Sequence, residues 1–403
     1  MERREFMTVA GGALMAGRVG GQARSGRGDS PALLSQEPAL GPTTFASRIQ
    51  RAQAELITRK WAALIATPGA NYRYFTGDSP GSSERLIALI VPAVGDAAIV
   101  CPAFEVDRIR GQTTIQDVRG WEERANPYDL VMQVVRARKP RGNGTIALEA
   151  STGFATYLRL KNALDWKFED ATEVTARLRS IKADEEVALI RRAIAITEDA
   201  LAATFAQLAV GMSERDAARL LTGEMDRRGA AGDGLVQFGA SSALPHGGPA
   251  GTTLRRESVV LIDCGCTVSG YTSDITRTVW FGDSPSPEFK TVYNLVYDAQ
   301  TAAIELGKPL STKCQEMDQA ARRVITQGGF GALFTHRLGH GIGLEIHEPP
   351  YLVEGNETRL EPGMVFTLEP GVYQPEKFGV RIEDDCVMTE NGVEVLSHRP
   401  VKI

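Results

Sequence analysis

Residues 259–281 read VVLIDCGCTVSGYTSDITRTVWF, and this stretch decides the fold of the second half of the chain. Its two apolar, β-branched runs are joined by a short polar segment, a pattern that predicts a β-hairpin. A turn that ends at Gly270 sets Asp263 opposite Asp274, with their Cβ atoms roughly 5 Å apart. Because two carboxylates at that separation repel each other unless cations lie between them, the hairpin predicts a metal site.

A second pair of acids repeats this arrangement near the C-terminus. Glu369 ends one apolar run, and Glu383 lies in a later one. A hairpin centred on Glu376 sets Glu369 opposite Glu383, while Arg381 shares the face of Glu383 and can orient a carboxylate. A single acid is usually exposed or ion-paired, but four acids on apolar strands in two matched hairpins indicate bound cations. Their four negative charges match two divalent ions.

Histidines gather between the two hairpins. Residues 336–349 read HRLGHGIGLEIHEP and contain His336, His340 and His347. The first two have the spacing of a zinc-protease helix, yet the glycines between them argue against a helix and no H-E-x-x-H follows. Three histidines amid glycines predict a loop that belongs to a site, and His246, just before the first acidic strand, adds a fourth.

The rest of the chain is organised into two domains. From about residue 45 onward, helical stretches alternate with short apolar runs, which is typical of a small α/β domain. The second domain opens with a long helix that we expect to end at Gly211, followed by a capping box at Ser213. Its later strands and helices make it α+β. We place the two domains at 45–175 and 176–403.

Five residues of these motifs, in chain order, resemble the metal ligands of the pita-bread metallopeptidase family: Asp263, Asp274, His340, Glu369 and Glu383. That family includes Xaa-Pro aminopeptidase, Xaa-Pro dipeptidase (prolidase), methionine aminopeptidase and the metal-free relative creatinase. The resemblance covers 176–396, and the preceding domain resembles the creatinase-type N-terminal domain of the proline-specific branch. The expected fold is therefore an α/β N-terminal domain plus an α+β pita-bread catalytic domain.

The resemblance implies a dinuclear, metal-dependent exopeptidase that hydrolyses Xaa-Pro bonds through a metal-bound hydroxide. Mostly oxygen ligands with one imidazole suit manganese, with cobalt, zinc or iron as alternatives. In the family's pattern Glu369 moves the proton of the attacking water, and His347 stabilises the oxyanion. His246 and His336 line the pocket and hold the substrate, and Arg381 ties down a metal ligand.

Two other functions stay open beside the leading one. The expected substrates of the leading function are proline-containing peptides or dipeptides, and the resemblance favours a homodimer. One alternative is a C–N hydrolase or lyase on the same fold that acts on a small zwitterionic substrate. The other is a metal-poor binding protein, against which the complete set of metal ligands argues.

Composition and the N-terminus bear on partners and location. The 403 residues carry a net charge of −5, and a basic stripe of the kind that binds nucleic acid is not apparent beyond a short N-terminal cluster. Residues 1–23 contain Arg3-Arg4 before a short apolar run and resemble a twin-arginine signal peptide, and 24–44 resemble a linker. The run is shorter than the ~18 residues that a membrane span needs. We therefore expect no membrane span and export to the periplasm or the exterior, with a cytoplasmic location as the alternative.

Overall fold

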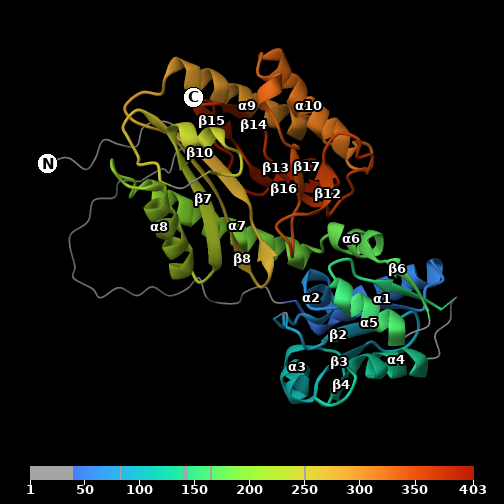
Figure 1. Cartoon of the computed structure of the whole chain (residues 1–403). Coiled ribbons are helices and arrows are strands. Elements are labelled where there is room, and N and C mark those ends of the chain that lie inside the picture. Colours follow the sequence, from blue (N-terminus) through green and yellow to red (C-terminus); the bar gives the residue numbers. More distant parts are fainter. Residues whose placement is uncertain (1–39, 82, 139–143, 164–165, 249–250) are drawn as a thin grey trace, which may run out of the picture. The chain divides into compact units, whose positions relative to one another are not determined.

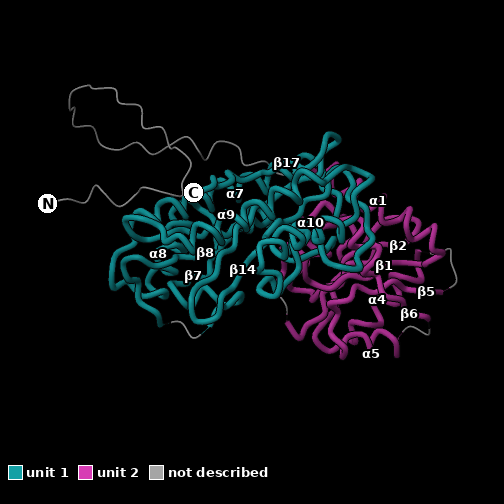
Figure 2. Tube along the Cα trace, turned by 90° about the horizontal axis from the view of Figure 1, so that it is seen from above, with its two compact units in different colours: residues 1–39, 180–403 teal, residues 40–179 magenta. Residues whose placement is uncertain are grey.

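The computed structural model describes residues 40–81, 83–138, 144–163, 166–248 and 251–403. They form two compact units, residues 40–179 and residues 180–403 (Figure 2). The expected signal peptide at 1–23 and most of the expected linker at 24–44 lie outside the described residues. Within the described ranges, no helix is both long and apolar enough to cross a membrane.

The N-terminal unit is built around a six-stranded mixed sheet in the order β4-β3-β2-β1-β5-β6 (Figure 1). Its strands are β1 (Ala63–Ala66), β2 (Ala88–Pro92), β3 (Ala98–Pro102), β4 (Asp117–Trp121), β5 (Thr145–Leu148) and β6 (Lys167–Asp170). Its helices are α1 (Pro42–Thr58), α2 (Ala70–Thr76), α3 (Val106–Gln112), α4 (Pro127–Ala137), α5 (Phe154–Ala163) and α6 (Thr172–Ser180), with a 3-10 turn η1 (Ala103–Glu105). Because β1, β2, β3 and β5 are short apolar runs, they are buried along their whole length.

The C-terminal unit combines four helices with eleven strands in the described residues. The helices are α7 (Asp184–Phe205), α8 (Glu214–Arg227), α9 (Pro287–Leu306) and α10 (Cys314–Gln327). The strands are β7 (Ala231–Phe238), β8 (Ser258–Val268), β9 (Tyr271–Thr272), β10 (Ile275–Phe281), β11 (Gly339–Gly341), β12 (Glu348–Leu352), β13 (Val365–Leu368), β14 (Gly371–Gln374), β15 (Phe378–Arg381), β16 (Asp384–Thr389) and β17 (Gly392–Val395). Two 3-10 turns, η2 (Gly239–Ala243) and η3 (Gly331–Leu333), complete the unit.

The C-terminal unit has two halves of similar plan (Figure 1). In the first half α7, with 22 residues, is followed by α8, with 14. In the second half α9, with 20 residues, is followed by α10, again with 14. Helices α7 and α8 pack on β8 and β7, while α9 and α10 pack on each other and on strands of the second half. Each half therefore supplies one of the two acidic hairpins to the interior.

Helix α7, the long helix that opens the second domain, is shorter than predicted. It ends at Phe205 and not near Gly211, because the chain turns there and the Gly211 N–H donates to the carbonyl oxygen of Leu254. The predicted cap of the next helix is confirmed, since the Ser213 hydroxyl oxygen accepts from the Asp216 N–H over 3.1 Å.

The turn of the first acidic hairpin differs from the predicted one. Ser269 and Gly270 both have positive φ, 48° and 92°. Two such residues form the two-residue turn that matches the twist of paired strands, so Val268 pairs directly with Tyr271. The centre of the hairpin therefore lies one residue farther along the chain than the sequence suggests.

The predicted pairing of Asp263 with Asp274 is wrong for this reason. Asp263 faces Thr276 across β8 and β10, and Asp274 lies in the break between β9 and β10. Because the register moves by an even number of residues, the alternation of side chains that places both acids on one face is unaffected.

The register of the second acidic hairpin is as predicted. The turn contains Glu376 with φ of 63°, and Gly371 faces Arg381 across β14 and β15. The ladder of β13 and β16 continues the same register. Glu369 and Glu383 occupy facing positions between the two ladders. The run predicted to end at Glu369 is β13, and the strand predicted to pass through Glu383 is split there into β15 and β16.

Candidate metal centre

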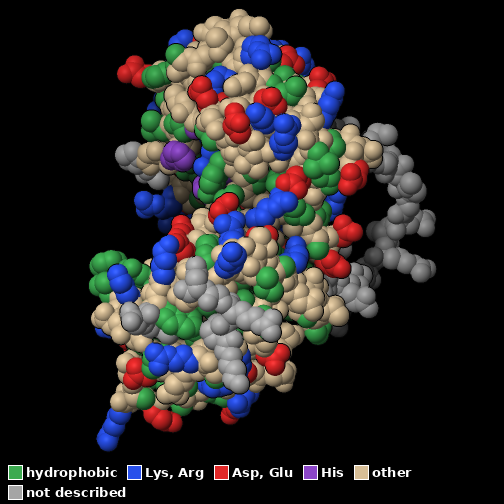
Figure 3. All heavy atoms as spheres, turned by 90° about the vertical axis from the view of Figure 1, so that its right-hand side faces the viewer, with side chains coloured by type: hydrophobic (Ala, Val, Ile, Leu, Met, Phe, Trp, Pro, Cys, Tyr) green, Lys and Arg blue, Asp and Glu red, His purple; other side chains and the backbone are tan. Residues whose placement is uncertain are grey.

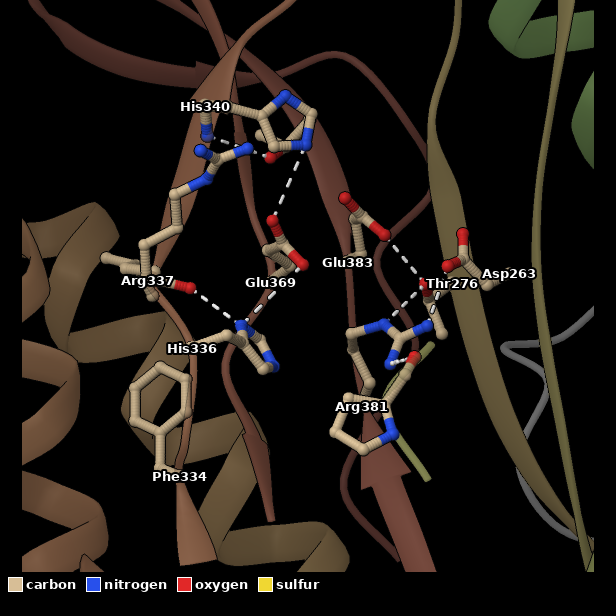
Figure 4. Close-up of polar contacts among 12 residues, drawn as sticks. Asp263, Thr276, Phe334, His336, Arg337, His340, Glu369, Arg381 and Glu383 are labelled. Atoms are coloured by element: carbon tan, nitrogen blue, oxygen red, sulfur yellow. Dashed lines mark hydrogen bonds and ion pairs between the residues drawn. The ribbon is translucent and has the colours of Figure 1, made fainter. Parts of the chain in front are cut away.

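The residues selected from the sequence line one cavity of the C-terminal unit, with a volume of about 720 Å³. They are Asp263, Asp274, His246, His336, His340, His347, Glu369, Arg381 and Glu383. Asp263, His340 and Arg381 come from β8, β11 and β15, and Asp274, Glu369 and Glu383 lie in short breaks between strands. The other three histidines lie in loops. Figure 4 shows that His340, Glu369, Glu383 and Asp263 succeed one another across the site.

Hydrogen bonds to neighbouring residues position two of the acids. The N–H of Asp274 donates to Oδ2 of Asp385 over 3.0 Å. Glu383 accepts at Oε2 from the Thr276 hydroxyl over 2.6 Å, whereas its Oε1 is buried without a hydrogen-bond partner in the described part of the chain. Because a buried carboxylate oxygen without a donor is costly, Oε1 suits a cation ligand.

The acids disturb one another's ionisation. Burial and then the charge of Glu383 raise the pKa of Asp274 and of Glu369 well above the usual range. Burial and then the charge of Asp263 raise the pKa of Glu383 to about 8. These three carboxylates therefore cannot all be ionised at neutral pH without compensating positive charge. Two divalent cations would supply that charge.

His340 presents a neutral imidazole to the acids. Its Nδ1 lies 3.1 Å from the carbonyl oxygen of Gly341, so we assign the ring proton to Nδ1. The Nε2 lone pair then faces Oε1 of Glu369 at 3.4 Å and Oδ2 of Asp274 at 3.7 Å. Burial lowers the pKa of His340 to about 3. A lone pair that faces two carboxylate oxygens is repulsive unless a proton or a cation lies between them, so these residues fit a metal.

The possible ligand atoms form overlapping groups whose members all lie within 4.8 Å of one another. One group is Asp263, Asp274 and Glu383, and a second is His340, Glu369 and Glu383. A third group contains Asp274, His340 and His347. Because Glu383 belongs to the first two groups, these donor atoms could hold more than one cation.

A hydrogen-bonded chain connects His336 to Asp263. The Tyr373 hydroxyl oxygen accepts from Arg381 Nη1 over 2.8 Å and lies 2.8 Å from Nε2 of His336. Nδ1 of His336 lies 2.7 Å from the carbonyl oxygen of Arg337, so Nδ1 is assigned the proton and Tyr373 donates to Nε2. Arg381 Nη2 in turn donates to Oδ2 of Asp263 over 2.6 Å. Since burial lowers the pKa of His336 to about 4, this ring is neutral at pH 7.

The other two histidines, His246 and His347, are exposed, although a ring nitrogen of His347 lies within 4.8 Å of possible ligand atoms of Asp274 and His340. The ring of His347 is exposed and packs edge-on against His340, with ring centroids 4.2 Å apart. Burial, followed by the charge of Arg337, lowers the pKa of His347. His246 lies in the loop after η2 and contributes to the cavity wall.

The sequence reasoning missed four residues of this site. Thr276 and Asp385 hold the acids, Tyr373 joins His336 to Arg381, and Arg337 lines the cavity. The correct turn at Ser269-Gly270 would have revealed Thr276, because it sets that residue opposite Asp263. Tyr373 and Asp385 carry no comparable signal, since their partners are distant in sequence.

Comparison with known proteins places this site in a family. The model of metallopeptidase family M24 matches residues 188–390, and that of the creatinase/prolidase N-terminal domain matches residues 48–181. An uncharacterized peptidase of Staphylococcus haemolyticus is 37% identical over 350 residues, which cover 84% of this chain and 94% of the relative.

Solved structures agree with the family models. A dipeptidase from Mycobacterium ulcerans is similar with a TM-score of 0.84 and 34% identity, over 90% of this chain and 98% of that chain. A Xaa-Pro dipeptidase from Bacillus anthracis is similar with a TM-score of 0.81 and 30% identity, over 89% and 99%. The family resemblance and the fold class inferred from the sequence are confirmed. The chain belongs to metallopeptidase family M24, whose enzymes depend on metal, and carries a creatinase/prolidase N-terminal domain.

Proposed function

We propose that this metallopeptidase is a dinuclear exopeptidase that hydrolyses Xaa-Pro bonds, as a Xaa-Pro dipeptidase or a Xaa-Pro aminopeptidase. The observation that carries the proposal is the Nε2 lone pair of His340, which faces carboxylate oxygens of Glu369 and Asp274 at 3.4 and 3.7 Å. The similar solved structures include a Xaa-Pro dipeptidase and prolidases, which supports the proline preference.

The proposed ligands are Asp263, Asp274, His340, Glu369 and Glu383. When bound, two divalent cations act as Lewis acids and lower the pKa of water at the site. Four carboxylates and one imidazole suit manganese, with cobalt, zinc and iron as alternatives. The buried Oε1 of Glu383 lacks a hydrogen-bond donor among the described residues, so a bound cation would compensate its charge.

The other roles in the proposed reaction belong to side chains of the protein. Oε1 of Glu369 lies 3.4 Å from Nε2 of His340, and Oε2 lies 3.9 Å from Nδ1 of His336. This carboxylate would take the proton of the attacking water and deliver it to the imide nitrogen of proline. His347 donates a ring N–H to the oxyanion from the exposed side of the site. Arg381 fixes Asp263, while Tyr373 holds His336 as part of the pocket wall.

The proposal extends to assembly and location. We propose a homodimer, since dimers are common on this fold, and export through the twin-arginine signal expected at 1–23. On the face drawn in Figure 3, acidic and basic side chains are interspersed, which agrees with peptide rather than nucleic-acid partners. Sedimentation of the purified protein and fractionation of cells that express the full chain test these two points.

A peptide panel tests the reaction itself. Protein loaded with manganese is incubated with Ala-Pro, Gly-Pro, Ala-Pro-Phe and the control dipeptide Ala-Ala, and released amino acid is measured. We expect release from the proline peptides and at most slow release from Ala-Ala, with activity lost in Glu369→Gln. Absence of release from every proline peptide, with metal bound, would overturn the proposed function.

A further inference from the structure

We propose that Arg337 binds the free C-terminal carboxylate of the substrate, which makes dipeptides the preferred substrate class of this site. The inference rests on the proposed function, because it assumes that a Xaa-Pro peptide occupies the cavity. It goes beyond that function by naming a residue that separates dipeptides from longer peptides.

The cavity is lined by two guanidinium groups, and only one is committed to an acid. Arg381 is 3% exposed and donates to Asp263 and to Tyr373. Arg337 is partly exposed on the same cavity wall, and among the described residues no carboxylate forms an ion pair with it. A cation without a counter-ion beside a substrate site is suited to an anion that arrives with the substrate.

The side chain of Arg337 is positioned by stacking. Its guanidinium carbon lies 4.5 Å from the centroid of the Tyr351 ring. Tyr351 faces His340 across β11 and β12, so the stack lies next to the proposed metal site. Among the described residues, the guanidinium N–H groups of Arg337 have no hydrogen-bond acceptor, so they are available to bind a carboxylate through two hydrogen bonds.

Arg337 lies close enough to the reacting groups for a short substrate to reach it. Arg337, His340, His347 and Glu369 line the same cavity. Figure 4 shows Arg337 beside His336 and His340. In a dipeptide the carboxylate lies one residue, about 3.5 Å of chain, beyond the scissile carbonyl.

In a Xaa-Pro dipeptide whose first residue is neither Asp nor Glu, the C-terminal carboxylate is the one anionic group. In a longer peptide a neutral amide takes its place, and the charge of Arg337 then lacks a partner. A site that is built to bind a charged group discriminates against the analogue without it. The dipeptide preference therefore comes from electrostatics and does not require a steric barrier.

The test compares Ala-Pro with its amide, Ala-Pro-NH2, which has the same length and shape but no negative charge. In the manganese-loaded wild-type protein we expect kcat/KM for Ala-Pro to exceed that for the amide by about 10- to 100-fold. In Arg337→Met, which keeps the apolar stem over Tyr351, the ratio of kcat/KM for the acid to kcat/KM for the amide should fall to about one, whatever change the two rates share. Arg337→Lys should recover part of the preference, and Arg323→Met, at an exposed arginine of α10, should behave as the wild type.

Three other outcomes are distinguishable. Equal rates of the wild type on acid and amide, or an equal loss on both substrates in Arg337→Met, would overturn the role of Arg337 and leave the proposed function intact. If neither substrate is hydrolysed, the proposed function fails. The inference is then decided by calorimetric binding of both compounds in the Glu369→Gln background, where Arg337→Met must weaken Ala-Pro about 10- to 100-fold and leave the amide unaffected.

Discussion

Lys182 Nζ donates to Oε1 of Glu348 over 2.8 Å, and the two side chains are 1% and 2% exposed. The pair joins the segment before α7 to the first residue of β12, directly after His347. Oε2 of Glu348 also accepts from the Glu345 N–H over 3.4 Å. Gly343 leaves room for the pair, since a Cβ there would lie 2.8 Å from Glu348 Oε1. This ion pair therefore holds the loop that presents His347.

Lys182→Met should destabilise the protein strongly, because it leaves the Glu348 carboxylate buried without its cation. We expect a loss of about 3–5 kcal/mol in the free energy of unfolding, measured in urea. The double variant Lys182→Met/Glu348→Gln should recover part of the loss, since the amide carries no charge. Arg191→Met is the matched control, because the Arg191–Glu394 pair is exposed and such pairs contribute at most about 1 kcal/mol. A single variant as stable as the wild type would contradict the assignment.

Thr276→Val should weaken metal binding while it preserves shape. The Thr276 hydroxyl donates to Oε2 of Glu383 over 2.6 Å and accepts from Arg381 Nε over 3.1 Å. Removing a group that orients a ligand typically costs about 10- to 100-fold in metal affinity. Competition with a fluorescent chelator measures the change, and Thr291→Val, at an exposed threonine of α9, is the control. Unchanged affinity would show that Thr276 does not support the ligand.

Asp274→Ala should abolish metal binding and activity together. His246→Ala should keep the metal and reduce the rate, because His246 lines the cavity but belongs to none of the groups of possible ligand atoms in the described residues. Metal analysis after reconstitution and gel filtration, together with hydrolysis of Ala-Pro, separates the two effects. Full metal occupancy in Asp274→Ala would refute the ligand assignment.

The stability of the metal-free protein should fall as pH rises toward 8. Without a cation, the pKa of Glu383 is raised to about 8, first by burial and then by Asp263, whereas an unfolded glutamate has a pKa of ~4.3. Between these values the folded state keeps a proton that the unfolded state has released, so the free energy of unfolding decreases with pH. Urea unfolding in a chelator across this range measures the slope.

Bound manganese should remove this slope and raise the free energy of unfolding, because the cations compensate the carboxylates and bind only the folded state. Glu383→Gln should also flatten the slope without added metal. A metal-free protein whose stability is independent of pH across the range would count against the clustering of these charges.

Much of the site could be read from local patterns. The acids end apolar runs, and the histidines lie in a glycine-rich segment, so His340, Glu369 and Glu383 could be chosen without coordinates. The pairing of the first hairpin could not, because its register depends on whether Ser269 adopts a positive φ, which a non-glycine residue adopts only at a cost. Contacts between distant segments, such as His336 with Tyr373, were also beyond local patterns.

The sequence by itself determined the candidate side chains of the site, the α/β and α+β character of the two domains and the register of the hairpin around Glu376. Those features follow from hydrophobic alternation and from neighbours in the chain. Only the tertiary structure decided that Asp263 faces Thr276, that Glu383 keeps an oxygen without a donor among the described residues, and that Arg337 stacks on Tyr351 beside the site. These relationships depend on burial and on electrostatics between segments that meet only in the folded chain, where a low dielectric makes each unpaired charge costly.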